Sequence, residues 1–214
     1  MAMWTWNLIN PAFLSGLIFP RFNYRISGSQ DAVFLTFDDG PHPELTPFVL
    51  DALANYGAKA TFFMLGCNVE KHPELLKRIL DEGHAIGNHT YNHLNGWLTN
   101  RSSYLQDIKK AAGYIHSKLF RPPYGRILPS QSKRLFEDYK IVMWDVMSYD
   151  FHPETSPEKC LSNVLDHTKP GSIIVFHENE KASTKLQQVL PKVLEVLSMK
   201  GYRFLPIQVS DLKG

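Results

Sequence analysis

Two histidines and two adjacent aspartates are the residues of this chain best suited to chemistry. His89 and His93 are four positions apart, a spacing that puts both rings on one face if the stretch is helical. Asp38 and Asp39 are neighbours at the end of an apolar run, so their carboxylates point in different directions. Taken alone, the aspartates fit a polar turn equally well. Together with the histidines they predict an open divalent-metal site, in which the unligated carboxylate acts as a base.

Other reactive side chains also follow short apolar runs. The run VFLTF (33–37) ends at the aspartate pair, and SIIVF (172–176) ends at His177. The run KIVMW (140–144) leads directly into Asp145. If these runs are parallel strands, their carboxyl ends meet at one rim, where α/β folds place their active sites.

Strand-like and helix-like segments alternate from about residue 31 to the end of the chain. This alternation predicts a parallel sheet with helices outside it. About seven such units favour a distorted (β/α) barrel, and an open doubly wound sheet is the alternative. The expected strands are 33–37, 59–64, 84–87, 119–121, 140–147, 172–176 and 202–206. The expected helices begin near Pro43 and Pro73 and continue at 101–117, 130–138, 156–167 and 184–199.

Length and composition predict a single globular domain. The chain has 214 residues, 43% of them hydrophobic, which is enough for one core, and we assign that domain to residues 31–214. The formal net charge is +2 and no basic stripe is present, so a nucleic-acid partner is not expected. Cys67 and Cys160 are too far apart for a metal motif and are expected to be free thiols.

The N-terminal segment is apolar and aromatic but is interrupted by polar residues and prolines. It makes a poor signal peptide and a poor transmembrane helix. We expect residues 1–30 to be an extension that packs on the domain. The alternative is an interfacial anchor at residues 1–22, which would give peripheral membrane or cell-envelope association. The compartment stays open between the cytoplasm and a cell-envelope-associated location, and the sequence does not indicate an oligomeric state.

Four motifs give the chain a specific resemblance. The sequences TFDDGP (36–41), HTYNH (89–93), RPPYG (121–125) and an apolar strand ending in His177 occur in that order. In this respect the chain resembles the polysaccharide deacetylase family, also called the NodB-homology domain or carbohydrate esterase family 4. The resemblance implies a distorted (β/α) barrel and an enzyme that removes acetyl groups from sugar polymers. It also implies one divalent metal, usually Zn²⁺, with Co²⁺, Ni²⁺ or Mn²⁺ as alternatives.

The resemblance also implies roles for individual residues. Asp38 would be the general base and His177 the general acid, and Arg121 would hold Asp38 ionised and oriented. The backbone N–H of Tyr124 would stabilise the oxyanion of the tetrahedral intermediate. The implied metal ligands are Asp39, His89 and His93.

Three further residues are predicted to shape the substrate site. Val175, two residues before His177, would line the hole for the acetyl methyl group. Pro122 would fix the backbone at the rim. Trp144 would either line the acetyl pocket or belong to the core.

One motif departs from the family pattern. Met147 stands where relatives carry the acid that tunes the catalytic histidine. We predict that Asp145, two residues earlier and on the same face of a strand, replaces that acid.

The leading prediction is a metal-dependent N-deacetylase acting on a chitin- or peptidoglycan-like glycan. The alternatives are an O-acetyl esterase on xylan or another glycan, and a carbohydrate-binding relative with weak catalysis.

Overall fold

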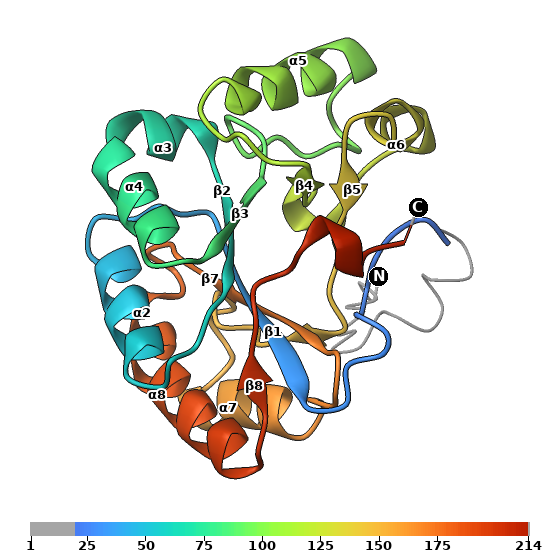
Figure 1. The fold of residues 1–214 in the computed structure, drawn as a ribbon. Helices are drawn as coiled ribbons and strands as arrows, with labels where there is room; N and C mark the ends of the chain where they lie inside the picture. The colour runs from blue at the N-terminus through green and yellow to red at the C-terminus, as the bar shows by residue number, and fades with distance from the viewer. Residues whose placement is uncertain (1–19, 214) are drawn as a thin grey trace, which may run out of the picture.

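Short buried strands alternate with helices along residues 20–213, the part of the chain that the computed structural model describes (Figure 1). Three of the helices begin at a proline, which is favourable because the first helical residue needs no N–H donor. The strands are β1 (Ala32–Asp38), β2 (Thr61–Met64), β3 (Ala85–Asn88), β4 (Leu119–Phe120), β5 (Lys140–Ile141), β6 (Val146–Met147), β7 (Ile173–His177) and β8 (Arg203–Phe204). The helices are α2 (Leu45–Ala54), α3 (Gly66–Lys71), α4 (Pro73–Asp81), α5 (Arg101–Ala112), α6 (Pro129–Leu135), α7 (Pro157–Leu165) and α8 (Ser183–Met199), with short 3₁₀ turns η1 (Pro123–Gly125) and η2 (Val209–Asp211).

The strands form one parallel sheet that curls into a barrel. Their order is β5-β4-β3-β2-β1-β7-β6, and β8 pairs with the start of β1. β5 and β6 are the two edges of this order, yet only residues 142–145 separate them in the chain. Such a link spans at most about 18 Å, so the two edges must approach each other. The predicted distorted (β/α) barrel is confirmed, and the open doubly wound alternative is wrong.

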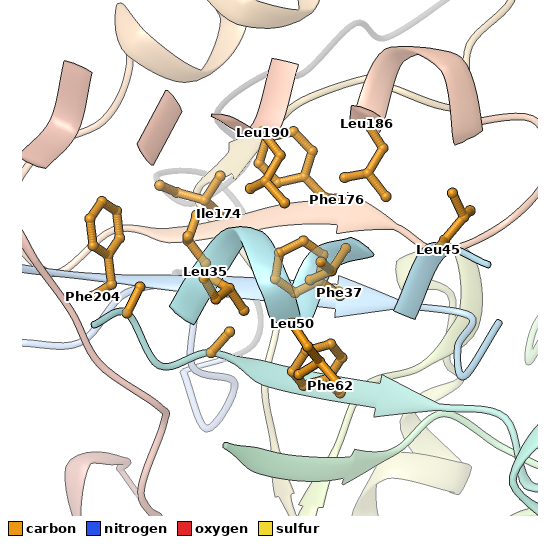
Figure 2. Packing of buried hydrophobic residues seen from close by; sticks show 14 of the residues in the cluster. Leu35, Phe37, Leu45, Leu50, Phe62, Ile174, Phe176, Leu186, Leu190 and Phe204 are labelled. Carbon is orange, nitrogen blue, oxygen red and sulfur yellow. The ribbon is translucent and has the colours of Figure 1, made fainter. Parts of the chain in front are cut away.

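The main hydrophobic core lies between the sheet and the helices α2 and α8 (Figure 2). Alternate residues of β1 face opposite sides of the sheet, and Leu35 and Phe37 face these helices. The ring of Phe37 stacks against Phe62 of β2 at 5.3 Å and against Phe176 of β7 at 6.1 Å between centroids. Asp38, the next residue of β1, therefore points to the barrel interior.

The described part of the N-terminal extension packs against the barrel. Phe22, Tyr24 and Ile26 are all buried. The alternative anchor at residues 1–22 lies almost entirely outside the described residues and stays a prediction. Within residues 20–213, no helix has the length and apolar character needed to cross a membrane.

One local prediction is wrong, and one stated condition is not met. The segment 140–147 is not one strand, because it divides into β5 and β6 at opposite edges of the sheet. Residues 89–93 do not form a helical turn; they form a loop after β3, in which Thr90 and His93 have φ of 68° and 58°. The two histidines therefore converge through a folded loop rather than by helical stacking.

Candidate active site

Three metal-ligating side chains converge at the carboxyl ends of β1 and β3. One ligand atom from each of Asp39, His89 and His93 lies within 4.8 Å of the other two. The Oδ1 atom of Asp39 is 3.1 Å from Nε2 of His93 and 3.6 Å from Nε2 of His89. Asp39 follows β1, and the two histidines come from the loop after β3. The structure therefore brings together the three ligands that the resemblance implied.

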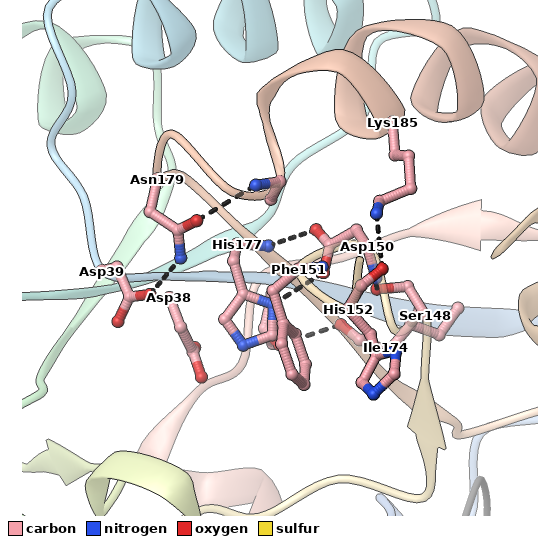
Figure 3. Close-up of polar contacts among 12 residues, drawn as sticks. Asp38, Asp39, Ser148, Asp150, Phe151, His152, Ile174, His177, Asn179 and Lys185 are labelled. Carbon is pink, nitrogen blue, oxygen red and sulfur yellow. Dashed lines mark hydrogen bonds and ion pairs between the residues drawn. The ribbon is translucent and has the colours of Figure 1, made fainter. Parts of the chain in front are cut away.

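Hydrogen bonds orient the three side chains so that one atom of each remains available. His89 Nδ1 lies 2.7 Å from the carbonyl of Arg121, so it carries the proton and Nε2 keeps its lone pair. Asn179 donates to Oδ2 of Asp39 at 2.7 Å (Figure 3). Asp39 Oδ1 is buried and has no hydrogen-bond partner among the described residues. An orphaned carboxylate oxygen facing two free imidazole nitrogens fits a bound cation.

The electrostatic environment favours the ligating forms. Burial lowers the pKa of His89 to about 4, against the opposing charges of Asp38 and Asp39, so the ring is neutral near pH 7. Burial alone would raise the pKa of Asp39. The close approach of His93 and the charges of the nearby histidines outweigh this and lower the pKa well below its usual range. A neutral imidazole and an ionised carboxylate are the forms that bind metal.

Asp38 forms a buried ion pair with Arg121 beside these ligands. The Arg121 side chain is fully buried, and Nη1 donates to Oδ1 of Asp38 at 2.7 Å and to the Thr36 hydroxyl at 2.7 Å. Its remaining nitrogens donate to the carbonyls of Val142 and Met143. The guanidinium therefore fixes the direction of the Asp38 carboxylate.

His177 stands next to Asp38, because the two residues are register partners at the ends of β7 and β1. Its Nδ1 lies 2.8 Å from Oδ1 of Asp150, and its backbone N–H donates to Oδ2 of Asp150 at 2.7 Å (Figure 3). Burial lowers the pKa of His177, but the charge and hydrogen bond of Asp150 outweigh it and raise the pKa to about 9. The ring is therefore protonated near pH 7 and can act as a general acid.

The prediction for Asp145 is wrong. Its carboxylate accepts hydrogen bonds from the Ser172 hydroxyl at 2.9 Å and from the Ile173 N–H at 2.7 Å. Asp145 is thus level with the start of β7, and His177 lies four residues further along that strand, about 13 Å away. The carboxylate that contacts His177 is that of Asp150, which follows β6 and so lies at the same end of the barrel as the catalytic residues.

The predicted substrate residues lie around this centre. The Tyr124 hydroxyl is 3.1 Å from Nδ1 of His93. The backbone of Tyr124 has a φ of 59°. Trp144 is half-buried, and a Cβ at Gly125 would lie 2.7 Å from its ring. Val175 is buried and shares the strand face of His177. The roles of Tyr124, Trp144, Val175 and the buried Pro122 in binding substrate stay predictions.

Besides Asp150, three positioning residues were not identified from the sequence. Thr36 accepts from Arg121, Asn179 holds Asp39, and Asn68 donates to the backbone carbonyl of Asp39 at 2.8 Å. Thr36 and Asn179 lie two residues from an assigned catalytic residue, and this proximity was an available signal. Asn68 comes from the unpredicted helix α3, and no pattern in the sequence pointed to it.

The chain is similar in sequence and in structure to known carbohydrate deacetylases. Residues 25–141 match the polysaccharide deacetylase family. A peptidoglycan-N-acetylglucosamine deacetylase of Bacillus cereus is 41% identical, over 87% of this chain and 71% of that protein. A chitooligosaccharide deacetylase of Azorhizobium caulinodans is 35% identical, over 72% of this chain and 77% of that protein. A similar solved structure is the crystal structure of a peptidoglycan N-acetylglucosamine deacetylase in complex with a substituted N-oxidanyl-benzamide. The match covers 90% of this chain and 94% of that chain, with 37% sequence identity and a TM-score of 0.84.

A parallel barrel whose rim carries three metal-ligating groups, a carboxylate base and a protonated histidine has the architecture of a metal-dependent hydrolase. The chain belongs to the polysaccharide deacetylase family, a family of hydrolases that in general depend on divalent metals. Within residues 20–213, Asp39, His89 and His93 form the candidate site for that metal.

Proposed function

We propose that this protein removes N-acetyl groups from the glucosamine units of peptidoglycan or a similar glycan, with Zn²⁺ as its metal. The observation that carries the proposal is the juxtaposition of the metal-ligand triad with two separate pairs, Asp38–Arg121 and Asp150–His177. A protein that only bound carbohydrate would need neither a base nor an acid. The relatives named above support an N-acetylated sugar as substrate.

The chain's own residues divide the proton transfers between them. Zn²⁺ held by Asp39, His89 and His93 would supply a Lewis acid for the acetyl carbonyl and lower the pKa of a water molecule. Asp38, held by Arg121, accepts the proton of the attacking water. His177, protonated near pH 7, donates its proton to the departing amine nitrogen. Acetate and a free amino sugar are the products.

The choice of zinc follows from the ligand types. Two imidazole nitrogens and one carboxylate, arranged openly on one side, are the ligand set of many catalytic zinc sites. Imidazole-rich sites also accept Co²⁺ and Ni²⁺, and Mn²⁺ is the weaker competitor. Mg²⁺ and Ca²⁺ prefer oxygen ligands and fit the site less well.

Acetate release from a substrate panel tests the proposal. The panel contains chito-oligosaccharides, peptidoglycan, acetylxylan and N-acetyl monosaccharides, each with and without a chelator. We expect release from the N-acetylated polymers, and we expect the chelator to abolish it. Release from acetylxylan alone would establish the O-acetyl esterase alternative. Release from no substrate at any metal loading would refute the deacetylase proposal.

A further inference from the structure

A group of exposed apolar side chains lies beside the candidate active site. Trp97, Leu98 and Tyr124 are 58%, 84% and 59% exposed, which places them among the most exposed large apolar residues of the described chain. Trp97 follows the ligand His93 by four residues, and the Tyr124 hydroxyl is 3.1 Å from His93 Nδ1. Single exposed apolar residues are ordinary, but a group of them at the rim of an active site indicates a ligand-binding surface.

The backbone that presents Trp97 is firmly held. The buried Gln131 side chain donates to the carbonyls of Gly96 and Thr99 at 2.9 and 3.1 Å. The Asn95 side chain accepts from the Trp97 N–H at 3.0 Å. The loop is therefore fixed on both sides of the indole, while the indole itself stays exposed. An aromatic ring presented by a fixed loop loses little conformational entropy when a ligand stacks on it.

Arg126 complements the exposed indole. Its guanidinium carbon lies 5.1 Å from the Trp97 ring centroid, which is within the range of a cation–π contact. No carboxylate of residues 20–213 lies within ion-pair distance of Arg126, so its donors are available to a ligand. Arg126 follows Tyr124 by two residues, so their Cα atoms lie within about 7 Å of each other. The backbone segments that carry Trp97 and Arg126 therefore adjoin those that carry His93 and Tyr124.

A flat aromatic ring beside free guanidinium donors matches the chemistry of a pyranose. The ring packs against the C–H face of a sugar, and the guanidinium donates hydrogen bonds to its hydroxyl groups. We propose that Trp97 and Arg126 bind a sugar unit adjacent to the one that is deacetylated. This proposal rests on the proposed function for the identity of the ligand, but its binding test does not require turnover.

A kinetic test compares substrates of increasing length. We expect kcat/KM for acetate release to rise from the monosaccharide N-acetylglucosamine to its pentasaccharide, because binding of the neighbouring sugars contributes to catalysis. Trp97→Ala should reduce kcat/KM for the pentasaccharide about tenfold, equal to about 1.4 kcal/mol, and leave kcat/KM for the monosaccharide nearly unchanged. Trp97→Phe, which keeps a flat ring, should recover most of the loss. Met199→Ala, at an exposed residue on the end of α8, is the matched control and should match the wild type.

A binding test separates this proposal from the deacetylase proposal. Chelator-treated wild-type and Trp97→Ala proteins are titrated calorimetrically with penta-N-acetylchitopentaose and with peptidoglycan glycan strands. We expect Trp97→Ala to raise the Kd about tenfold, even if the protein proves to release no acetate. Equal affinity and equal kcat/KM for both proteins at every length would overturn the sugar subsite while leaving the deacetylase intact. Absence of binding to either glycan by the wild-type protein would also overturn it.

Discussion

Arg121 is the residue that most restricts how the active site can be arranged. Its side chain is fully buried, and its hydrogen bonds run to Asp38, to Thr36 and to two backbone carbonyls. A buried charge without partners is strongly destabilising, so this side chain has only one good position. Asp38 is consequently held in one orientation next to its register partner His177.

Replacing Asp38 by Asn should separate proton transfer from metal binding. Asn keeps the shape of the side chain but cannot accept a proton from water, so kcat should fall by about 10³-fold. Metal content after dialysis should not change, because Asp38 does not belong to the ligand triad. Acetate release and elemental analysis measure the two properties. Asp166→Asn, at the exposed end of α7, is the control, and near-normal turnover by Asp38→Asn would refute the assigned base.

Replacing Asp150 by Asn should move the alkaline limb of the pH–rate profile. The charge of Asp150 is the main influence that raises the pKa of His177, to about 9. His177 must be protonated to act as an acid, so activity is lost as pH rises through this pKa. Without the charge of Asp150 the pKa falls, and activity should be lost at lower pH. Asp145→Asn is the matched control, and a shift in that variant instead would restore the original prediction for Asp145.

The reactive residues could be predicted because each belongs to a short contiguous motif. Asp38 with Asp39, and His89 with His93, are recognisable without knowing which strands pair. The partner of His177 could not be predicted in this way, since it depends on where the chain turns after β6. Asn68 in α3 and Asn179 in the loop after β7 were missed because a single amide side chain carries no distinctive spacing.

At the scale of the element, the division of the segment 140–147 had the largest consequence. Its apolar residues run on without a turn signal, so composition alone indicates one strand. Only closure of the barrel requires the chain to leave the β5 edge and pair with β7 within a few residues. This crossing places Asp145 beside the start of β7. There its carboxylate accepts hydrogen bonds from Ser172 and Ile173 and does not contact the catalytic histidine.

His84, the residue before β3, makes the free energy of unfolding depend on pH. The ring of His84 is buried and its Nδ1 accepts the Ala60 N–H at 3.1 Å, which only the neutral ring can do. Burial, aided by the charge of Lys59, lowers the pKa of His84 to about 4. The unfolded chain titrates near 6.5, so between these values it binds more protons than the folded chain. Stability from this group is complete above about pH 6.5 and is lost as pH falls towards 4, by up to about 1.4 kcal/mol per pH unit.

The variant His84→Gln tests this contribution. Its amide oxygen can still accept the Ala60 N–H, but it does not titrate, so the variant should lose less stability between pH 6.5 and 4. Denaturant unfolding of both proteins at several pH values measures the difference. His116→Gln, at an exposed histidine, should follow the wild-type curve. Parallel curves for wild type and His84→Gln would contradict the assignment.

At the scale of the whole molecule, the proposed metal joins parts of the barrel that are distant in sequence. Asp39 follows β1, whereas His89 and His93 follow β3, with β2 between these strands in the sheet. The unfolded chain does not hold these three groups together. A cation that binds the folded protein alone must therefore stabilise the barrel by mass action.

Zinc should consequently raise the thermal stability of the chelator-treated protein. At a free concentration about 100-fold above the Kd, the stabilisation is about 2.7 kcal/mol, which corresponds to a rise in Tm of roughly 5–10 °C for a protein of this size. Differential scanning calorimetry at increasing zinc concentration measures this rise. Magnesium should have little effect, because it prefers oxygen ligands. His93→Ala should abolish the response to zinc, and a full response in that variant would show that zinc binds elsewhere.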